Sequence, residues 1–223
     1  MSTPITTLPA PIIELELSLL PEPSSKRLLD LLIIAALTPL LLPAILLLAC
    51  LIKLTSRGPL FYGHTRIGQA GRTFTAWKFR TMVKDAEAAL ERHLFDNPDW
   101  AEEWRRHHKL RRDPRITAIG GFLRRFSLDE LPQLLNVVKG EMSLIGPRPI
   151  VAQEIARYGC SFRLYCQVKP GITGLWQVSG RNNTTYDQRV SFDQYYVRNR
   201  SVTLDLYILK QTLRAVLSGD GAY

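Results

Sequence analysis

The spacing of apolar and polar positions divides the chain into an apolar segment and a longer mixed part. Residues 31–52 form a run of 22 residues without a charged side chain, which is long enough to cross a bilayer as a helix. Residues 60–82 then alternate between apolar and polar positions, as strands do. Residues 85–110 are charged and alanine-rich and are broken at Asn97-Pro98, which predicts two helices. We therefore expect a mostly helical α+β fold with a small β element.

Two later segments repeat apolar residues at helical spacing and carry basic residues beside the apolar stripe. The stripes are Ile116, Ile119, Phe122, Leu123 and Phe126, and then Leu206, Leu209, Leu213 and Val216. Such a helix can pack on a core or lie on a membrane surface with its basic residues at the headgroups. Because a membrane segment precedes them, we expect amphipathic interfacial helices.

The apolar run contains two prolines, and positive charge flanks both of its ends. Thr38-Pro39 and Pro43 lie in its middle, where each proline removes a helix hydrogen bond and bends the axis. The flanking cations are Lys26, Arg27, Lys53 and Arg57, so the positive-inside rule gives no orientation. A re-entrant membrane helix hairpin, broken at Thr38 and Pro39, satisfies both observations. A kinked spanning helix fits the residues equally well.

These features predict three parts of the chain. Residues 1–25 carry five prolines and are expected to be a poorly ordered leader. Residues 26–57 are the re-entrant membrane helix. Residues 58–223 are expected to be a catalytic domain at the cytosolic face, with interfacial helices.

Composition narrows the class of partner only partly. The net charge of +9 favours an anionic partner, which can be a nucleic acid, a lipid surface or a phosphorylated substrate. The three cysteines form no CxxC pair, so neither a disulfide framework nor a zinc site is indicated.

The candidate chemistry centres on two adjacent acids in the segment SLDELPQ, residues 127–133. Pro132 is tolerated in a first helical turn, which predicts a helix that starts between Ser127 and Asp129 and ends near Lys139-Gly140. Ser127 and Glu130 match a capping box, which is the purely structural interpretation. Because neighbouring helical residues point about 100° apart, Asp129 can attack a phosphorus while Glu130 holds a divalent cation such as Mg2+.

Basic residues elsewhere fit the same phosphate chemistry. Arg148 lies between Pro147 and Pro149, and this stiff loop lowers the entropy lost when the guanidinium binds a phosphate. In the segment WKFRTM, the period of two places Lys78 and Arg80 on one strand face and Trp77 and Phe79 on the other. An ordinary half-buried strand is the alternative interpretation of that segment.

At this point the motifs resemble a known family, the bacterial sugar transferases, which are monotopic phosphoglycosyl transferases. The resemblance covers about residues 26–223, whereas the leader matches nothing. The matching segments are KRLLD at 26–30, RIG at 66–68, WKFRTM at 77–82, DPRIT at 113–117, SLDELPQLLNVVKGEMSLIGPRP at 127–149, KPGITGLWQVSGR at 169–181 and DQYYV at 193–197. The family's helix break is a Ser-Pro pair, for which this chain has Thr38-Pro39, and Pro43 is an additional break.

The resemblance implies an enzyme that moves a hexose 1-phosphate from a UDP-sugar to undecaprenyl phosphate and releases UMP. It implies Asp129 as the nucleophile that carries a covalent phosphosugar and Glu130 as the Mg2+ ligand. The same resemblance implies substrate-binding roles for Arg148, Arg124, Lys78 and Asp193. We add Arg80 as a further candidate, because the strand pattern places it on the same face as Lys78. The tail resembles members that transfer galactose or glucose 1-phosphate.

The implied location is the cytoplasmic face of the bacterial inner membrane. No nucleic-acid partner is expected, and the resemblance is compatible with a homodimer. Two alternatives remain open from the sequence. One is a one-step metal-dependent transferase in which Asp129 only binds metal. The other is a membrane-tethered basic binding protein, which does not need the acid pair.

Overall fold

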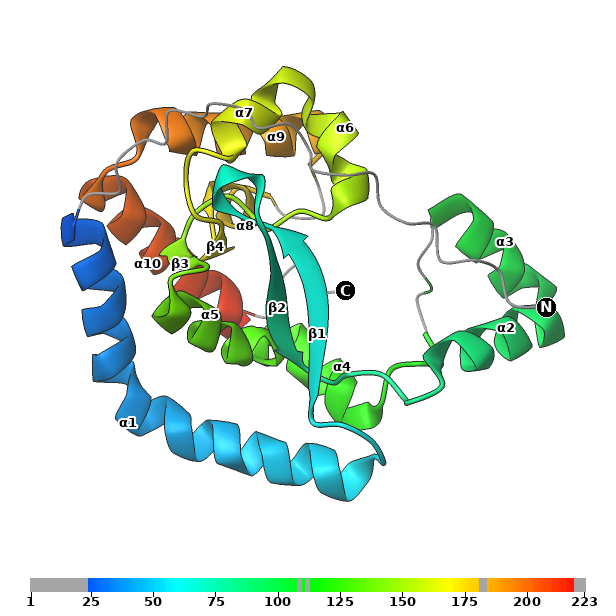
Figure 1. The fold of residues 1–223 in the computed structure, drawn as a ribbon. Helices are drawn as coiled ribbons and strands as arrows, with labels where there is room; N and C mark the ends of the chain where they lie inside the picture. The colour runs from blue at the N-terminus through cyan, green and yellow to red at the C-terminus, as the bar shows by residue number, and fades with distance from the viewer. Residues whose placement is uncertain (1–23, 108–109, 111–112, 181–183, 219–223) are drawn as a thin grey trace.

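The computed structural model describes residues 24–107, 110, 113–180 and 184–218. Helices predominate over strands, as the sequence predicts (Figure 1). The predicted leader, residues 1–25, lies almost entirely outside the described residues.

The apolar run folds into α1 (Ser24–Thr55), a single 32-residue helix that contains both Pro39 and Pro43. The helix bends around the rest of the molecule and continues through both prolines (Figure 1), so the break predicted at Thr38 and Pro39 is corrected to a bend within one helix. Each proline removes one intrahelical hydrogen bond, while the Thr38 hydroxyl donates to the Ile34 carbonyl at 2.7 Å. The loss therefore bends the helix without ending it.

Both ends of α1 contact the same folded body, and its middle does not. Near the start, Lys26 pairs with Asp205 at 2.7 Å, and the Ser143 hydroxyl donates to Asp30 at 2.6 Å. Near the end, Leu48 and Ile52 are buried in one cluster with Phe79 and Leu123. Residues 35–40 are exposed. Only 6% of the most apolar 18-residue window of α1 is buried, so α1 is not a core helix.

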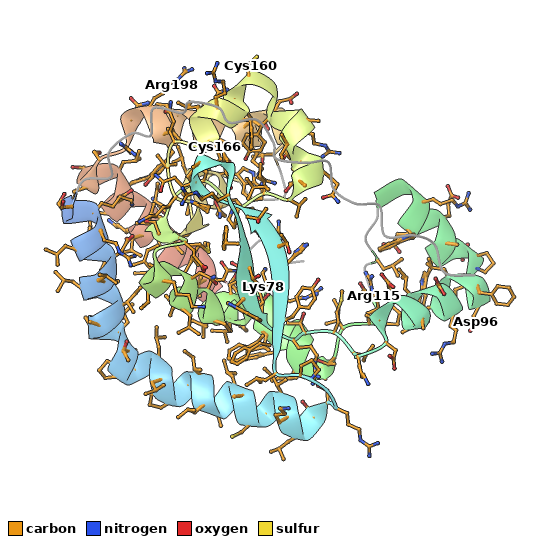
Figure 2. All side chains as sticks on the ribbon, in the orientation of Figure 1. Lys78, Asp96, Arg115, Cys160, Cys166 and Arg198 are labelled. Carbon is orange, nitrogen blue, oxygen red and sulfur yellow. The ribbon has the colours of Figure 1, made fainter. Side chains whose placement is uncertain are left out.

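The alternating segment forms an antiparallel hairpin of β1 (Phe61–Ile67) and β2 (Thr73–Phe79), in which Tyr62 pairs with Lys78. The short helix η1 (Gln69–Gly71) makes the turn. The predicted helix pair is also present, as α2 (Ala86–Asp96) and α3 (Pro98–His107). This pair projects to one side, and Asp96 lies there, well away from Lys78 on the hairpin (Figure 2).

The amphipathic segment before the acid pair becomes α4 (Ala118–Arg125), whose N-cap Thr117 accepts from the Gly120 amide. After it come the 3-10 helix η2 (Leu128–Gln133) and α5 (Leu134–Lys139), which ends at Gly140 as predicted.

The rest of the chain wraps around a short parallel pair, β3 (Ser143–Ile145) and β4 (Gly171–Thr173). Between and after these strands lie η3 (Ala152–Glu154), α6 (Ile155–Tyr158), η4 (Gly159–Ser161), α7 (Phe162–Tyr165), α8 (Leu175–Val178), α9 (Tyr186–Asn199) and α10 (Val202–Ser218).

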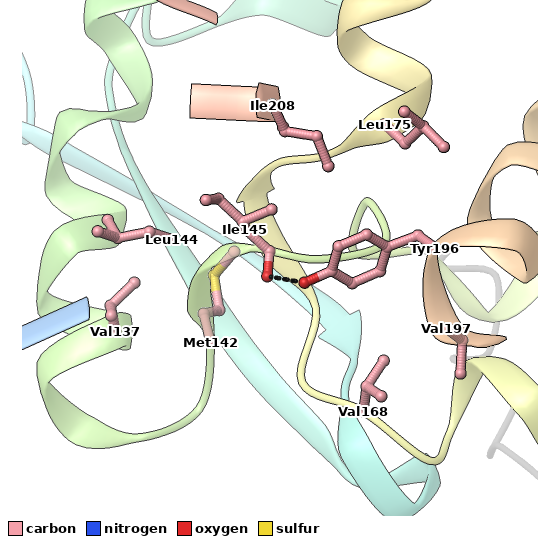
Figure 3. Packing of buried hydrophobic residues seen from close by; sticks show 9 residues of the cluster. All are labelled: Val137, Met142, Leu144, Ile145, Val168, Leu175, Tyr196, Val197 and Ile208. Carbon is pink, nitrogen blue, oxygen red and sulfur yellow. Dashed lines mark hydrogen bonds between the residues drawn. The ribbon is translucent and has the colours of Figure 1, made fainter. Parts of the chain in front are cut away.

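Tyr196 and Ile145 lie in the largest apolar cluster, where the Tyr196 hydroxyl donates to the Ile145 carbonyl at 3.1 Å (Figure 3). Gly171 packs so closely that an added Cβ would lie 2.1 Å from the Gly146 nitrogen. This backbone contact fixes where the chain leaves β3, just before Arg148.

Candidate active site

The acid pair lies on the 3-10 helix η2, between α4 and α5. Asp129 is 8% exposed, and Glu130 is half-buried. The α-helix begins at Leu134 instead of the predicted start between Ser127 and Asp129. Pro132 has no N–H for the carbonyl four residues back, which prevents regular α-helical bonding at this point.

The structure does not support the alternative interpretation of this segment as a capping box. Ser127 adopts a left-handed conformation, with φ of 55°, and its side chain makes no cap hydrogen bond. The Glu130 amide donates instead to the Ser127 carbonyl at 3.3 Å. A left-handed conformation costs a non-glycine residue roughly 1–2 kcal/mol, and such conformations cluster at functional sites. Here it turns the chain sharply just before the acids.

The strand β2 places Lys78 beside both acids. Its Nζ lies 2.5 Å from Glu130 Oε1 and 3.7 Å from Asp129 Oδ2. One cation is therefore shared by two carboxylates, which reduces their mutual repulsion.

The two acids have pKa values displaced in opposite directions. Burial raises the pKa of Asp129 above its usual range, although Lys78 acts against this. Burial acts on Glu130 in the same sense, but Lys78 and Arg148 outweigh it and hold the pKa of Glu130 below its usual value. The pair therefore consists of two chemically different carboxylates.

Arg124, on α4, is a second cation that acts on Asp129. Its Nε donates to the Thr81 hydroxyl at 2.8 Å. Burial lowers the pKa of Arg124, and the negative charge of Asp129 acts against that shift. The guanidinium is thus within electrostatic reach of Asp129, as the resemblance implies.

Arg148 contributes a cation without an anionic partner. It follows β3 on a loop, and its guanidinium carbon lies 5.7 Å from the centre of the Trp176 ring. Its positive charge lowers the pKa of Glu130. Among the described residues, no carboxylate forms an ion pair with it. A half-buried guanidinium near an acid pair is suited to bind a phosphate.

Arg80 does not join this group. Its Nη2 donates to the Ser56 carbonyl and hydroxyl at 2.8 and 2.7 Å, and the residue is only 7% exposed. Strand β2 ends at Phe79, so the alternation that would have placed Arg80 beside Lys78 does not extend to it. Arg80 lies instead against the segment that follows α1.

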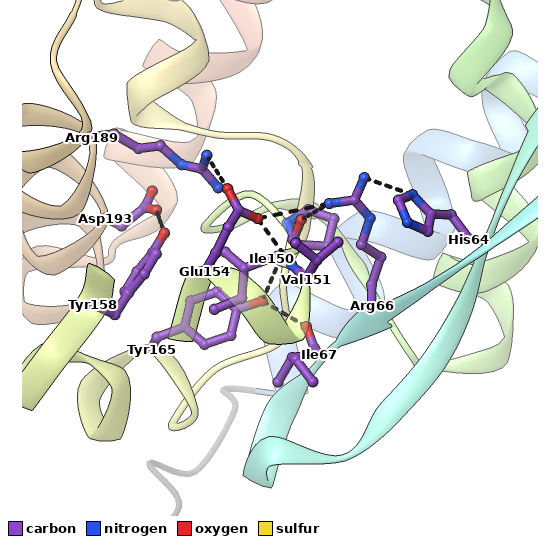
Figure 4. Close-up of polar contacts among 11 residues, drawn as sticks. His64, Arg66, Ile67, Ile150, Val151, Glu154, Tyr158, Tyr165, Arg189 and Asp193 are labelled. Atoms are coloured by element: carbon purple, nitrogen blue, oxygen red, sulfur yellow. Dashed lines mark hydrogen bonds and ion pairs between the residues drawn. The ribbon is translucent and has the colours of Figure 1, made fainter. Parts of the chain in front are cut away.

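Asp193 lies in a neighbouring buried cluster on α9. Its Oδ2 accepts from the Tyr158 hydroxyl at 2.6 Å (Figure 4). Burial raises the pKa of Asp193 to about 7, against the effect of Arg189 and Arg148. Asp193 therefore belongs to the surroundings of Arg148 and not to the immediate contacts of the acid pair.

The sequence did not single out three charged residues that connect these parts: Arg66, Glu154 and Arg189, here called the Arg–Glu–Arg cluster. Glu154 lies 3.0 Å from Arg189 Nη1 and 4.0 Å from Arg66 Nη1 (Figure 4). Arg66 belongs to the RIG motif, which was a usable signal. Nothing local in the sequence marks Glu154 or Arg189.

The acid pair fits a magnesium ion that is shared with a substrate. No group of three or more possible protein ligands occurs in the part of the chain that the structure describes. Mg2+ is commonly bound by one or two carboxylates together with substrate phosphates and water. Glu130 provides one such carboxylate, and the substrate phosphates and water would provide the other ligands.

Comparison with known proteins identifies the family. The bacterial sugar transferase family matches residues 22–219. The chain belongs to this family and is an enzyme of the phosphoglycosyl transferase class.

Particular relatives agree with this assignment. The chain is 47% identical to the exopolysaccharide production protein ExoY of Sinorhizobium fredii strain NGR234. The alignment spans 199 residues, or 89% of this chain and 88% of that protein. It is 52% identical over 166 residues to the undecaprenyl-phosphate galactose phosphotransferase of Salmonella typhimurium, or 74% of this chain and 35% of that longer protein. It is 39% identical over 206 residues to the UDP-glucose:undecaprenyl-phosphate glucose-1-phosphate transferase of Caulobacter vibrioides, or 89% of this chain and 72% of that protein.

Proposed function

We propose that this protein transfers galactose 1-phosphate or glucose 1-phosphate from a UDP-sugar to undecaprenyl phosphate, through a covalent phosphosugar on Asp129. The transfer would be the first membrane step of exopolysaccharide synthesis. The observation that carries the proposal is the buried Asp129 carboxylate, with Lys78 Nζ at 3.7 Å. Arg148, which forms no ion pair within the described part of the chain, acts on the neighbouring Glu130. Relatives named as galactose and glucose phosphotransferases support the sugar.

In the first step, an Asp129 oxygen attacks the phosphorus that bears the sugar. The bond from that phosphorus to the bridging oxygen breaks, and UMP leaves with the bridging oxygen. Asp129 must be ionised for this attack, and Lys78 favours the ionised form by lowering the pKa that burial raises. Arg148 and Arg124 offset the negative charge of the diphosphate and of the approaching carboxylate.

In the second step, a phosphate oxygen of undecaprenyl phosphate attacks the same phosphorus. The bond between phosphorus and Asp129 breaks, which restores the carboxylate and leaves an undecaprenyl diphosphate sugar. Glu130 would hold Mg2+ together with the substrate phosphates, and the cation would supply charge neutralisation.

The membrane geometry that suits this reaction is re-entrant. The ends of α1 contact one folded body through Lys26–Asp205 and through Ile52, and the apolar middle is exposed. A helix held at both ends by one body enters and leaves the bilayer on the same side. We therefore place the acid pair at the cytoplasmic face of the bacterial inner membrane, where a UDP-sugar and a lipid phosphate can both reach it.

The two alternatives account for less of the site. A one-step transferase would need the acids only as metal ligands, and it gives no reason for the opposite pKa displacements of Asp129 and Glu130. A basic binding protein does not need the acid pair. The chain also belongs to an enzyme family, which argues against a binding function alone.

The proposal is tested with the full chain in lipid nanodiscs that contain undecaprenyl phosphate and Mg2+. We expect UMP release with UDP-galactose or UDP-glucose and a loss of about 10³-fold or more in Asp129→Asn, as for other catalytic nucleophiles. The control is Asp187→Asn, because Asp187 is an exposed carboxylate on α9. No UMP from any UDP-sugar, or full activity in Asp129→Asn, would refute the proposal.

A further inference from the structure

The backbone on both sides of Arg148 is held by hydrogen bonds from distant parts of the chain. The Pro147 carbonyl accepts from the Gly171 amide at 2.8 Å, and the Pro149 carbonyl accepts from Arg66 Nη1 at 3.1 Å. These bonds come from β4 and from β1. The loop is therefore fixed by tertiary contacts as well as by its two prolines.

The next two residues are fixed in the same way. The Ile150 carbonyl accepts from the Ile67 amide at 2.9 Å. The Val151 amide donates to Glu154 Oε2 at 2.9 Å. The segment from Pro147 to Val151 thus has a defined path from end to end.

Glu154 connects this segment to two other elements. While Oε2 accepts from Val151, Oε1 accepts from Arg189 Nη1 on α9 at 3.0 Å. Oε2 also lies 4.0 Å from Arg66 Nη1, and that nitrogen holds the Pro149 carbonyl. Glu154 therefore joins the end of the Arg148 loop to β1 and to α9 (Figure 4).

The negative charge of Glu154 also stabilises the arginines around it. Burial lowers the pKa of Arg66, and the positive charges of Arg148 and Arg189 lower it further, whereas Glu154 acts in the opposite sense. Glu154 is itself ionised, because the Val151 amide, Arg189 and Arg66 outweigh the effect of burial and lower its pKa. Its anion compensates a group of three guanidinium ions that would otherwise repel one another.

From these contacts we infer that Glu154 is a positioning residue that holds Arg148 in place for the donor diphosphate. Glu154 acts through the backbone of residues 147–151 and through Arg66 and Arg189, and it does not itself touch substrate. The inference rests on the proposed function in that Arg148 binds the diphosphate. Removing Glu154 leaves Arg66 and Arg189 without their shared anion and frees the Val151 amide, so the end of the Arg148 loop is held less firmly and Arg148 is less well placed.

The test measures UDP binding, which needs no transfer chemistry, by titration calorimetry on the full chain in nanodiscs. We expect Glu154→Ala to weaken UDP binding by about 10-fold, the loss typical of a hydrogen bond to a charged group. Glu154→Gln should lose less, because its amide oxygen still accepts from Val151 or Arg189. In the Arg148→Ala background, Glu154→Ala should cause at most about a 2-fold further loss, because coupled residues are non-additive.

The matched control is Asp205→Ala, which removes another buried carboxylate that is paired with a cation, Lys26. We expect it to lower the melting temperature and leave the affinity for UDP unchanged. An equal loss from Glu154→Ala with and without Arg148 would overturn the positioning role, as would no loss in either Glu154 variant. If wild-type protein fails to bind UDP, the donor class in the proposed function is wrong instead.

Discussion

At the scale of single residues, the two adjacent acids differ because their surroundings differ. Burial is the largest effect at both acids. It prevails at Asp129 and raises its pKa, whereas at Glu130 the opposing effects of Lys78 and Arg148 outweigh burial and lower its pKa. A carboxylate with a raised pKa is the stronger nucleophile once it is ionised. A carboxylate with a lowered pKa stays anionic and suits a metal ion. This difference is the physical basis for assigning attack to Asp129 and cation binding to Glu130.

The acid limb of the pH–activity profile tests how Lys78 affects the ionisation of Asp129. In the proposed mechanism the reacting form of Asp129 is the anion, so activity is expected above its pKa and is lost as pH falls through it. Lys78→Met removes the cation that lowers this pKa, so we expect the acid limb of UMP release to move to higher pH. Single-turnover UMP release, measured across pH at saturating UDP-sugar, gives the shift.

The matched control for this prediction is Lys139→Met, which removes an exposed lysine at the end of α5. Its acid limb should coincide with that of the wild type. An unchanged acid limb in Lys78→Met would show that Lys78 does not set the ionisation of Asp129.

Local sequence patterns identified some site residues and missed others. Asp129, Glu130 and Arg148 stand in short motifs, and Lys78 stands in an alternating strand, so each was visible. The position of Arg80 depends on the exact end of β2, and the absence of a capping box depends on one left-handed residue, Ser127. Glu154 and Arg189 are 35 positions apart in the chain, and their pairing exists only in the folded protein.

At the scale of elements, strong periodicity was a good guide and short buried segments were not. The β1–β2 hairpin and the α2–α3 pair follow from alternation and from the Asn97-Pro98 break. Strands β3 and β4 have three residues each, too few to show a period. The sequence therefore does not predict that the segments before Arg148 and around Gly171 pair as parallel strands.

The bend in α1 makes a topological prediction. Single cysteines are introduced by Ser24→Cys or Pro59→Cys, both exposed positions, after the native cysteines are replaced by serine. An impermeant maleimide should label both positions from the cytoplasmic side, in inside-out vesicles and not in intact cells, because one folded body holds both ends of α1. Labelling from opposite sides would show a spanning helix.

A straightened helix provides the comparison for this experiment. Pro39→Ala combined with Pro43→Ala restores the two intrahelical hydrogen bonds that the prolines remove. We expect this variant to shift labelling at one position to the opposite side of the membrane. If its labelling matches that of the bent helix, the prolines do not determine the topology.

At the scale of the whole molecule, exposed apolar side chains occur on several elements besides α1. Phe122 on α4, Leu135 on α5 and Leu213 on α10 are each between 49% and 60% exposed. This exposure suits contact with a membrane surface. It is consistent with the proposed transfer of a sugar phosphate to a lipid-bound acceptor.

The central claim is that Asp129 becomes covalently modified. The most direct measurement is intact-protein and peptide mass spectrometry of the full chain after rapid quenching, following incubation with UDP-galactose or UDP-glucose and Mg2+ without undecaprenyl phosphate. We predict one phosphohexose per protein on Asp129, UMP release that stops at one equivalent, and neither in Asp129→Asn. Turnover that requires undecaprenyl phosphate, with no modification and no UMP in its absence, would contradict the account and favour a one-step transfer.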